Sequence, residues 1–392
     1  MTEKKATKAG GARFLALDSM RGLLALTVVL FHLPSEGWLW TFRYIQHGHL
    51  AVTFFFVLSG FVIGTTYGER LASGFPVGRF LGLRLGRIYP LHLFMIAVLL
   101  AWQLCRLAFH IGAVRDGMPF TGKFDPALLP FHIFLLQKFR SPLGWNDPSW
   151  SIGVEWWVYV SFALIVAFVF RRNRAFAGIS MLLPEIAQRL TNTSLGMGMD
   201  ATIDCLFCFG LGLLVCEVRR SPLWSRTDRI GSNAATLIEL AAVALGLWMI
   251  AHFGGKLSPL MAPTFALMIA IFSIEGGWVS RLLMTAPMLL IGELSYSIYM
   301  IHHFILDRMI DLVWAFGGAL HLPISITSEG RTVLIGNPIA CDLFSLVLLG
   351  VVIAFSVLSF RYVEKPARLW SRRMLNPNHS EKVTPRDPTA AF

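Results

Sequence analysis

The most informative property of this 392-residue sequence is how little charge it carries. Asp, Glu, Lys and Arg make up 15% of the residues, whereas 55% are hydrophobic and the mean hydropathy is +0.62. Soluble globular proteins carry about 25% charged residues. Apolar runs recur between Leu17 and Phe360, and a helix needs about 20 such residues to cross about 30 Å of hydrocarbon. The sequence therefore predicts an integral membrane protein and excludes a soluble one.

Cysteine is also scarce, and the few cysteines present do not form a metal-binding pattern. All five cysteines lie in or beside apolar segments: Cys105, Cys205, Cys208, Cys216 and Cys341. Cys205 and Cys208 form a single CxxC, which lacks the second ligand pair that a zinc site needs. The histidines are scattered and no carboxylates cluster at ligand spacing. We therefore expect the cysteines to be small core residues and the protein to hold no metal ion.

A cleavable signal peptide is absent as well. The polar start MTEKKATKAGGAR leads into the first apolar segment, which has no small-residue cleavage site after it. We therefore expect the N-terminus to stay in the cytosol.

The net charge of +11 is distributed in a pattern typical of membrane proteins. Lys and Arg gather in the N-terminal tail and in four later stretches, 70–87, 171–174, 219–229 and 361–386. Such clusters mark cytosolic loops by the positive-inside rule. Anionic lipid headgroups attract them with about 1 kcal/mol per basic residue. Membrane lipids, and no nucleic acid, are therefore the partners that this charge predicts.

The apolar runs between the basic clusters predict an all-α polytopic bundle of about ten transmembrane helices with both termini in the cytosol. The expected spans are 17–33, 50–67, 88–109, 150–170, 175–190, 201–218, 235–253, 259–275, 286–306 and 333–359. The corresponding division is a cytosolic tail over 1–16, a transmembrane domain over 17–366, and a partly disordered cytosolic tail over 367–392.

The first apolar segment, LDSMRGLLALTVVLFH, contains Asp18, Arg21 and His32. A charge in hydrocarbon costs at least a few kcal/mol, so it is retained where it has a partner or a function. Arg21 and His32 lie eleven positions apart, close to a whole number of helical turns, and so share one face about 16 Å apart. One interpretation is an interfacial arginine and a histidine that caps the outer helix end. The other is an anion site joined to a general base, because imidazole exchanges protons near neutral pH.

Two further arginines, Arg84 and Arg87 in RLGRIYPLH, lie one helical turn apart at the expected cytosolic end of the third span. Guanidinium groups on one face suit phosphate oxygens. The alternative is that they belong to the positive-inside pattern, which accounts for Arg70 and Arg79.

The segment NDPSWSIGVEWWVY places Glu155 in the first turns of the fourth span. A carboxylate near a helix N-terminus is favourable in itself, and the neighbouring tryptophans also fit an interfacial aromatic belt. A carboxylate among aromatic side chains is equally suited to a sugar. We therefore predict that Trp150 and Ser151 contact a substrate and that Glu155 has a catalytic or binding role.

The segment GELSYSIYMIHHFI carries an unusual number of hydrogen-bonding side chains for a membrane span. Ser295, Tyr299 and His302 lie along one face, with Tyr296 and His303 on the neighbouring face. This arrangement predicts a polar cavity in the bundle, with Tyr296, Tyr299, His302 and His303 as substrate-binding residues. Interface anchoring is the alternative for tyrosines and histidines at a helix end.

Taken together, these segments resemble the acyltransferase-3 family of bacterial membrane O-acyltransferases. The resemblance covers nearly the whole chain and rests on an ordered set of motifs: Arg21 and His32 separated by ten residues, FFFVLSGFVI, the pair Arg84 and Arg87, SWSIGVEWWVY, LSYSIYMIHH and RYVEKPAR. Some members carry an additional esterase-like SGNH domain after the membrane part. Only a short tail follows Pro366 here, so we expect a stand-alone membrane domain.

The resemblance implies transfer of an acyl group, most commonly acetyl, from cytosolic acyl-CoA to a hydroxyl of a carbohydrate or glycolipid in the bacterial cytoplasmic membrane. Arg21, Arg84 and Arg87 would hold the CoA phosphates, and His32 would be the general base. Glu155 would orient the imidazole or bind the acceptor. Direct transfer and a covalent acyl-enzyme both remain open.

Two other functional classes fit some of the same residues. In a proton-coupled transporter or flippase, Arg21, His32 and Glu155 would line the pathway. The sequence lacks the internal repeat that many transporters show, which favours the enzyme. A scaffold in an envelope-synthesis complex would keep its function without His32.

Overall fold

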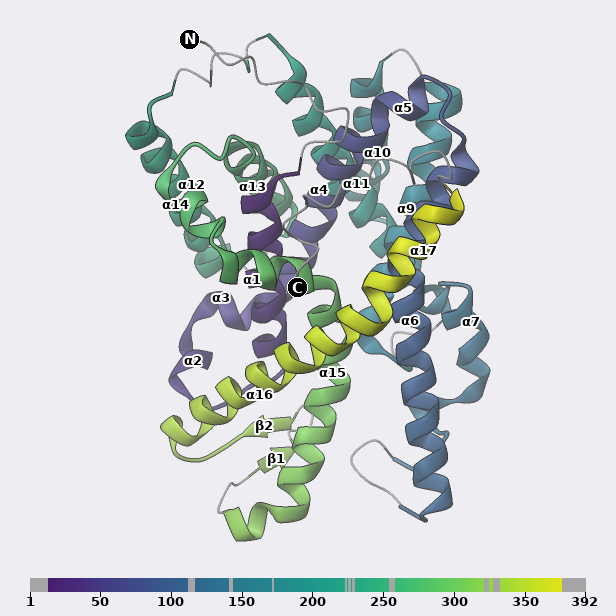
Figure 1. Ribbon diagram of the computed structural model, residues 1–392, viewed down its shortest axis with the longest axis vertical. Coiled ribbons are helices and arrows are strands. Elements are labelled where there is room, and N and C mark those ends of the chain that lie inside the picture. Colours follow the sequence, from purple (N-terminus) through teal and green to yellow (C-terminus); the bar gives the residue numbers. More distant parts are fainter. Residues whose placement is uncertain are drawn as a thin grey trace.

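The protein is a bundle of long helices (Figure 1), which the computed structural model describes for residues 13–111, 117–140, 144–170, 173–222, 224, 227, 230–253, 258–320, 324–326 and 332–375. The first part of the chain contains α1 (Leu15–Phe31), α2 (Trp38–Thr41), α3 (Arg43–Gln46), α4 (Ala51–Ile63), α5 (Glu69–Ala72), α6 (Val77–Ala108), α7 (Leu129–Ile133), α8 (Gln137–Arg140) and α9 (Trp150–Leu164). The second part contains α10 (Arg174–Thr191), α11 (Met197–Arg220), α12 (Ser232–Phe253), α13 (Ser258–Phe272), α14 (Trp278–Leu283), α15 (Ala286–Leu320), β1 (Ile324–Ile326), β2 (Thr332–Leu334), α16 (Pro338–Ser359) and α17 (Lys365–Leu375).

Each of the ten predicted spans falls largely on one of these helices, and the predicted class of an all-α membrane protein is confirmed. Among the described residues, seven helical runs are long and apolar enough to cross a membrane. They are Gly48–Ala72, Val77–Ala108, Asp147–Val169, Met197–Arg220, Ser232–Phe253, Ala286–Val313 and Pro338–Leu375. Helices α1 and α13, with 17 and 15 residues, are shorter, and α10 is less apolar. The full count of ten and the cytosolic termini stay predictions.

Helices α1 and α15 form the closest helix pair at the site and run parallel to each other. Near their starts, the Arg21 Nε–H donates to Ser295 Oγ over 2.7 Å, and further along, His32 reaches His302. The contact is tight because glycines face each other: a Cβ on Gly22 would lie 2.6 Å from backbone atoms of Ile291 and Gly292. Small residues let helices approach closely in a membrane. A parallel pair is what the ten-span prediction requires of its first and ninth spans.

Replacing Gly22 with alanine is expected to destabilise the protein, because the added methyl group overlaps the α15 backbone. Overpacking of this kind costs about 1–3 kcal/mol. Gly350, within α16, is the matched control, since a Cβ there meets nothing within 4 Å. Thermal unfolding in detergent should show a lower midpoint for Gly22→Ala and a slightly higher one for Gly350→Ala, where only the better helix propensity of alanine acts. Equal midpoints for both variants would contradict the close α1–α15 contact.

The last part of the chain differs from the sequence prediction at the start of the last span, and it adds one further helix. The predicted span 333–359 begins too early, because β2 pairs with β1 as an antiparallel hairpin and α16 starts only at Pro338. Asn337 fixes that start, since its side chain accepts a hydrogen bond from the Ile339 N–H. Beyond the predicted domain end at residue 366, the described chain continues as the helix α17, which packs along α6. Residues 376–392 of the predicted tail lie outside the described residues.

Candidate functional site

A cavity of about 110 Å³ lies among α1, α4, α6, α9 and α15, and we call it the central cavity. Its polar lining contains Arg21, Ser59, Arg84, Arg87, Ser151, Glu155, Tyr159, Ser295, Tyr296 and Tyr299. The structure therefore brings together seven of the predicted site residues: Arg21, Arg84, Arg87, Ser151, Glu155, Tyr296 and Tyr299. A polar cavity on the α15 segment was predicted, and the central cavity lies there, with apolar as well as polar lining residues.

Arg21 and Glu155 are fixed in the central cavity by nearby side chains. Besides Ser295, Arg21 contacts the Gly292 carbonyl and forms an ion pair with Asp18, one turn earlier on α1. The hydroxyl of Tyr159 donates to Glu155 Oε1 over 2.6 Å, and Ser59 Oγ lies 2.9 Å from the same hydroxyl. Glu155 thus faces the central cavity rather than His32. Of the two roles left open for it, contact with a bound substrate is the one that this placement supports.

A second cavity, of about 240 Å³, adjoins the first, because Arg84 and Arg87 line both. We call it the basic cavity; it is lined by Tyr67, Leu83, Arg84, Arg87, Arg368, Ser371 and Arg372. Among the described residues, no acceptor lies within hydrogen-bonding distance of the buried Nε of Arg84 or of Arg368. Buried donors normally have acceptors. These two nitrogens are themselves buried, so it is the charge of the four lining arginines that suits the basic cavity to an anion with several oxygens.

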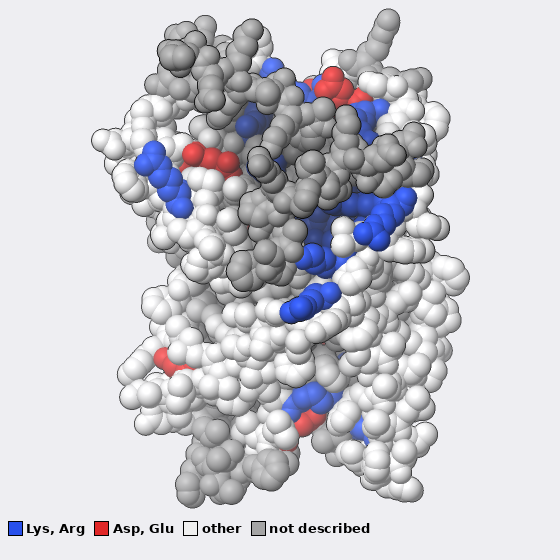
Figure 2. Space-filling view, in the orientation of Figure 1, with Lys and Arg blue, Asp and Glu red and all other residues white. Residues whose placement is uncertain are grey.

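Helix α17 supplies half of the arginines of the basic cavity. It lies across α6, where Gly82 and Gly86 leave room for Leu375 and Ser371. Just before it, the buried Glu364 accepts from Ser297 Oγ over 2.6 Å and forms an ion pair with Arg368. In Figure 2, Lys and Arg side chains gather over α17.

His32 lies at the other end of α1 and does not line either cavity. Its Nδ1 donates to the Val28 carbonyl over 2.8 Å and lies 3.3 Å from His302 Nε2. Nδ1 of His302 is 2.7 Å from the Tyr299 carbonyl. With Nδ1 as its donor, neutral His32 carries its basic lone pair on Nε2. Tyr299 connects the two regions, because its hydroxyl lies in the central cavity, 2.9 Å from Ser151 Oγ.

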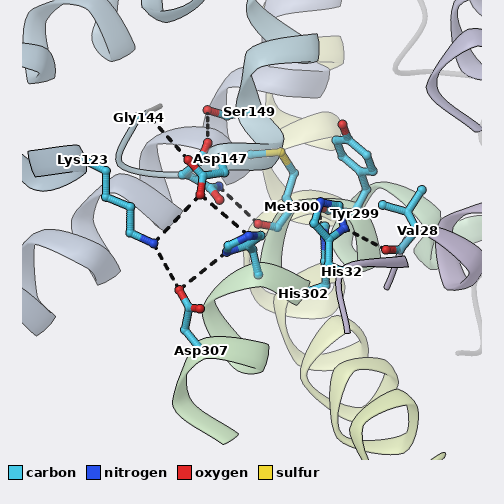
Figure 3. Close-up of polar contacts among 12 residues, drawn as sticks. Val28, His32, Lys123, Gly144, Asp147, Ser149, Tyr299, Met300, His302 and Asp307 are labelled. Carbon is cyan, nitrogen blue, oxygen red and sulfur yellow. Dashed lines mark hydrogen bonds and ion pairs between the residues drawn. The ribbon is translucent and has the colours of Figure 1, made fainter. Parts of the chain in front are cut away.

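Near His32 lies a group of charged, partly exposed side chains (Figure 3). We call His303, Asp147, Asp307 and Lys123 the outer cluster. His303 lies 3.7 Å from an Asp147 oxygen and 3.5 Å from an Asp307 oxygen, and Lys123 Nζ lies 3.9 and 3.5 Å from the same two carboxylates. Among the described residues, no group of three His, Cys, Asp or Glu side chains is arranged to hold a metal ion.

The loop before α9 holds Asp147 in its place in the outer cluster. The Asn146 side chain donates to the Met300 carbonyl on α15 over 3.2 Å. The Trp145 N–H donates to His132 Nε2 over 3.1 Å. Burial, together with the nearby His92, lowers the pKa of His132 to about 3. His132 therefore stays neutral and keeps its acceptor lone pair for this hydrogen bond.

The comparison with protein families identifies the chain. The acyltransferase domain, as defined for the acyltransferase-3 family, matches residues 14–361, most of the sequence. The chain belongs to the acyltransferase-3 family. This acyltransferase is a multi-pass membrane protein, as its apolar helices require. The resemblance predicted from the motifs is thereby confirmed.

Two relatives of this acyltransferase illustrate the range of the family. Acyltransferase MdmB from Streptomyces mycarofaciens is 25% identical over 322 residues, which cover 75% of this chain and 79% of that protein. Protein 2 in picA locus from Rhizobium radiobacter is 39% identical over 150 residues, which cover 36% of this chain and 75% of that protein. No solved structure matches the acyltransferase.

Besides His32, three predicted site residues of the acyltransferase lie outside the central cavity. Trp150 lines a different cavity, of about 220 Å³, together with Glu185, Arg189 and Asp204. His302 is fully buried, and His303 belongs to the outer cluster. The prediction missed Arg368 and Arg372 of the basic cavity and Lys123, Asp147 and Asp307 of the outer cluster. Arg368 lies in the motif RYVEKPAR, and Asp307 lies one helical turn after His303.

Proposed function

We propose that this acyltransferase moves an acyl group, with acetyl as the first candidate, from cytosolic acyl-CoA to a hydroxyl of a carbohydrate or glycolipid in the bacterial cytoplasmic membrane. The observation that carries the proposal is the adjoining pair of cavities, in which Arg84 and Arg87 face both spaces. The two parts of acyl-CoA match these two cavities. Its nucleotide head carries several phosphates, and its long, uncharged pantetheine arm ends in the thioester.

The basic cavity suits the head of CoA. Four arginines, namely Arg84, Arg87, Arg368 and Arg372, offer forked donors to phosphate oxygens. Arg21 then completes the positive lining of the central cavity, where the pantetheine arm would lie and bring the thioester towards Tyr299.

The reaction itself needs a base and a site for the acceptor. In the proposal, the acceptor hydroxyl gives its proton to Nε2 of His32 while its oxygen attacks the thioester carbonyl, and CoA leaves as the thiolate. General base catalysis contributes about 10²–10⁴-fold, and positioning supplies much of the remainder. Glu155, Tyr159 and Ser151 offer hydrogen bonds to hydroxyl groups of the acceptor.

Binding of acyl-CoA tests the proposal directly. The purified protein in detergent is expected to bind acetyl-CoA and to release CoA thiol slowly, with water as the acceptor. Acetyl-pantetheine, which lacks the nucleotide and its phosphates, should bind at least about 100-fold more weakly, because it loses two or more charge-assisted hydrogen bonds of about 1.5–3 kcal/mol each. If no short acyl-CoA binds, or if acetyl-pantetheine binds equally well, the proposal is wrong.

A further inference from the structure

The cavity that contains Trp150 lies in line with the central and basic cavities. We call it the carboxylate cavity; its polar lining residues are His49, Thr53, Trp150, Glu185, Arg189 and Asp204. One helical run, Gly48–Ala72, passes all three cavities. Thr53 lines the carboxylate cavity, Ser59 the central cavity and Tyr67 the basic cavity. Thr53 and Tyr67 are 14 positions apart, about 21 Å along a helix, so the carboxylate cavity lies at the opposite end of the span from the basic cavity.

The carboxylate cavity adjoins the central cavity. Val52 and Phe56 on α4 line both of them. On α9, Trp150 lines the carboxylate cavity, whereas the next residue, Ser151, lines the central cavity. A molecule in the carboxylate cavity therefore lies beside the space that the proposed function assigns to the thioester.

The carboxylate cavity is also close to the proposed base. The ring centroid of His49, in its lining, lies 5.4 Å from that of Phe31. Phe31 in turn lies 5.0 Å from the ring of His32. One aromatic ring thus separates the wall of this cavity from the imidazole. The carboxylate cavity, the thioester space and the base meet in one region of the bundle, which is what a transfer reaction requires of its acceptor site.

The lining of the carboxylate cavity offers hydrogen bonds that the protein itself does not use. Within the described part of the chain, neither the hydroxyl of Thr53 nor the indole N–H of Trp150 has a hydrogen-bond partner. Lys138 lies over the Trp150 ring, 4.9 Å from its centroid, so the N–H is the group that Trp150 offers to a ligand. Sugar hydroxyls both donate and accept hydrogen bonds and therefore match such a lining.

The charges in the carboxylate cavity favour an uncharged sugar over an acidic one. Glu185 is 5% exposed and forms an ion pair with Arg189, one turn later on α10. Among the described residues that line this cavity, Arg189 is the only Lys or Arg. Asp204 on α11 adds a second carboxyl group. Sugar hydroxyls can donate to these carboxyl oxygens, whereas an acidic sugar would meet like charge and no unpaired Lys or Arg.

From this geometry we propose that the carboxylate cavity is the acceptor site, that it binds an uncharged sugar, and that the sugar enters from the membrane face opposite the one at which acyl-CoA binds. This inference rests on the proposed function. The reacting hydroxyl passes Val52 and Phe56 to reach the central cavity. A purely structural role explains the ion pair of Glu185 with Arg189, but not an open volume of about 220 Å³.

Protection of an introduced cysteine tests the site without acyl-CoA. Thr53→Cys is treated with N-ethylmaleimide in a detergent that has no sugar headgroup, and the adduct at residue 53 is quantified by mass spectrometry. The probes are the methyl glycosides of glucose, galactose and mannose, and methyl glucuronide is the acidic counterpart. Ligands of this size reach dissociation constants of about 1 mM. At least one neutral glycoside, at about 10 mM, should therefore slow the alkylation about tenfold.

Thr121→Cys is the matched control, because Thr121 is exposed and lines none of the three cavities. Its alkylation should be the same with and without glycoside, and methyl glucuronide should protect neither cysteine. The inference is overturned if no neutral glycoside protects Thr53→Cys, if methyl glucuronide protects it equally, or if N-ethylmaleimide does not reach it at all. Each of these results leaves the proposed function standing, because none involves acyl-CoA.

A rate measurement links the site to the reaction. The glycoside that protects is expected to raise CoA thiol release from acetyl-CoA above the rate with water alone, and alkylated Thr53→Cys should lose that increase. Protection without any increase, in a protein that binds acetyl-CoA, would show that the bound sugar is not the acceptor. A wild-type protein that binds no short acyl-CoA would overturn the proposed function, and the acceptor role with it.

Discussion

Replacement of His32 by glutamine is expected to lower the rate of CoA thiol release from acetyl-CoA by about 10²–10⁴-fold, the usual contribution of a positioned general base. Glutamine keeps much of the volume of histidine and still donates a hydrogen bond, but it cannot accept a proton at neutral pH. Binding of acetyl-CoA should remain at the wild-type level, because His32 lines neither the central cavity nor the basic cavity. The measurement pairs the turnover rate with equilibrium binding of radiolabelled acetyl-CoA.

The control for this variant is His252→Gln. His252 makes the same local contact as His32, since its Nδ1 lies 3.0 Å from the carbonyl of Trp248, four residues earlier. It lies at the end of α12, outside both cavities. Full activity in His252→Gln together with loss in His32→Gln would separate proton transfer from the local contact. A His32→Gln protein that folds, binds acetyl-CoA and turns over normally would exclude His32 as the base.

Removal of Arg84 and Arg87 together is expected to weaken acetyl-CoA binding by at least about 100-fold. Hydrogen bonds to charged groups contribute about 1.5–3 kcal/mol each, and 1.4 kcal/mol corresponds to a factor of ten. Both side chains face the central and the basic cavities, so the double variant Arg84→Ala/Arg87→Ala removes positive charge from the entire shared wall. Titration of the purified variants with radiolabelled acetyl-CoA gives the dissociation constants.

The test becomes specific for phosphate when the ligand is varied as well. Acetyl-pantetheine should bind the double variant and the wild type with similar affinity, because it has none of the phosphates that the arginines would hold. Arg79→Ala is the control on the same helix: Arg79 lies 5.5 Å from the Phe75 ring and lines neither cavity. An equal loss of acetyl-CoA binding in Arg79→Ala would mean that overall positive charge, rather than the basic cavity, attracts the ligand.

The sequence identified the charged residues that lie within apolar helices, where a charge is energetically unfavourable. Arg21, Arg84, Arg87 and Glu155 stand out because charge is rare in an apolar helix, and the structure brings all four to the central cavity. Helical spacing also placed His32 far from Arg21 on the same helix. These inferences needed only the period and the rise of one helix.

Contacts between segments that are distant in the chain could not be predicted from the sequence. Arg368 and Arg372 reach the basic cavity because α17 turns back across α6, and no local pattern reveals that angle. Lys123 and Asp147 come from the long connection between α6 and α9, where no periodicity guides a prediction. Trp150 and Ser151 were both predicted to contact a substrate, yet neighbours on a helix point about 100° apart, and they line different cavities.

The position of α17 at the end of the described chain has a consequence for how the protein is made. Arg368 and Arg372 are synthesised after all the other described helices, so the basic cavity is incomplete while the ribosome is still translating and those helices are being inserted. A nascent or truncated chain that lacks α17 would present Arg84 and Arg87 without their two companions. On the proposed function, acyl-CoA is therefore bound fully only by chains whose synthesis has passed α17.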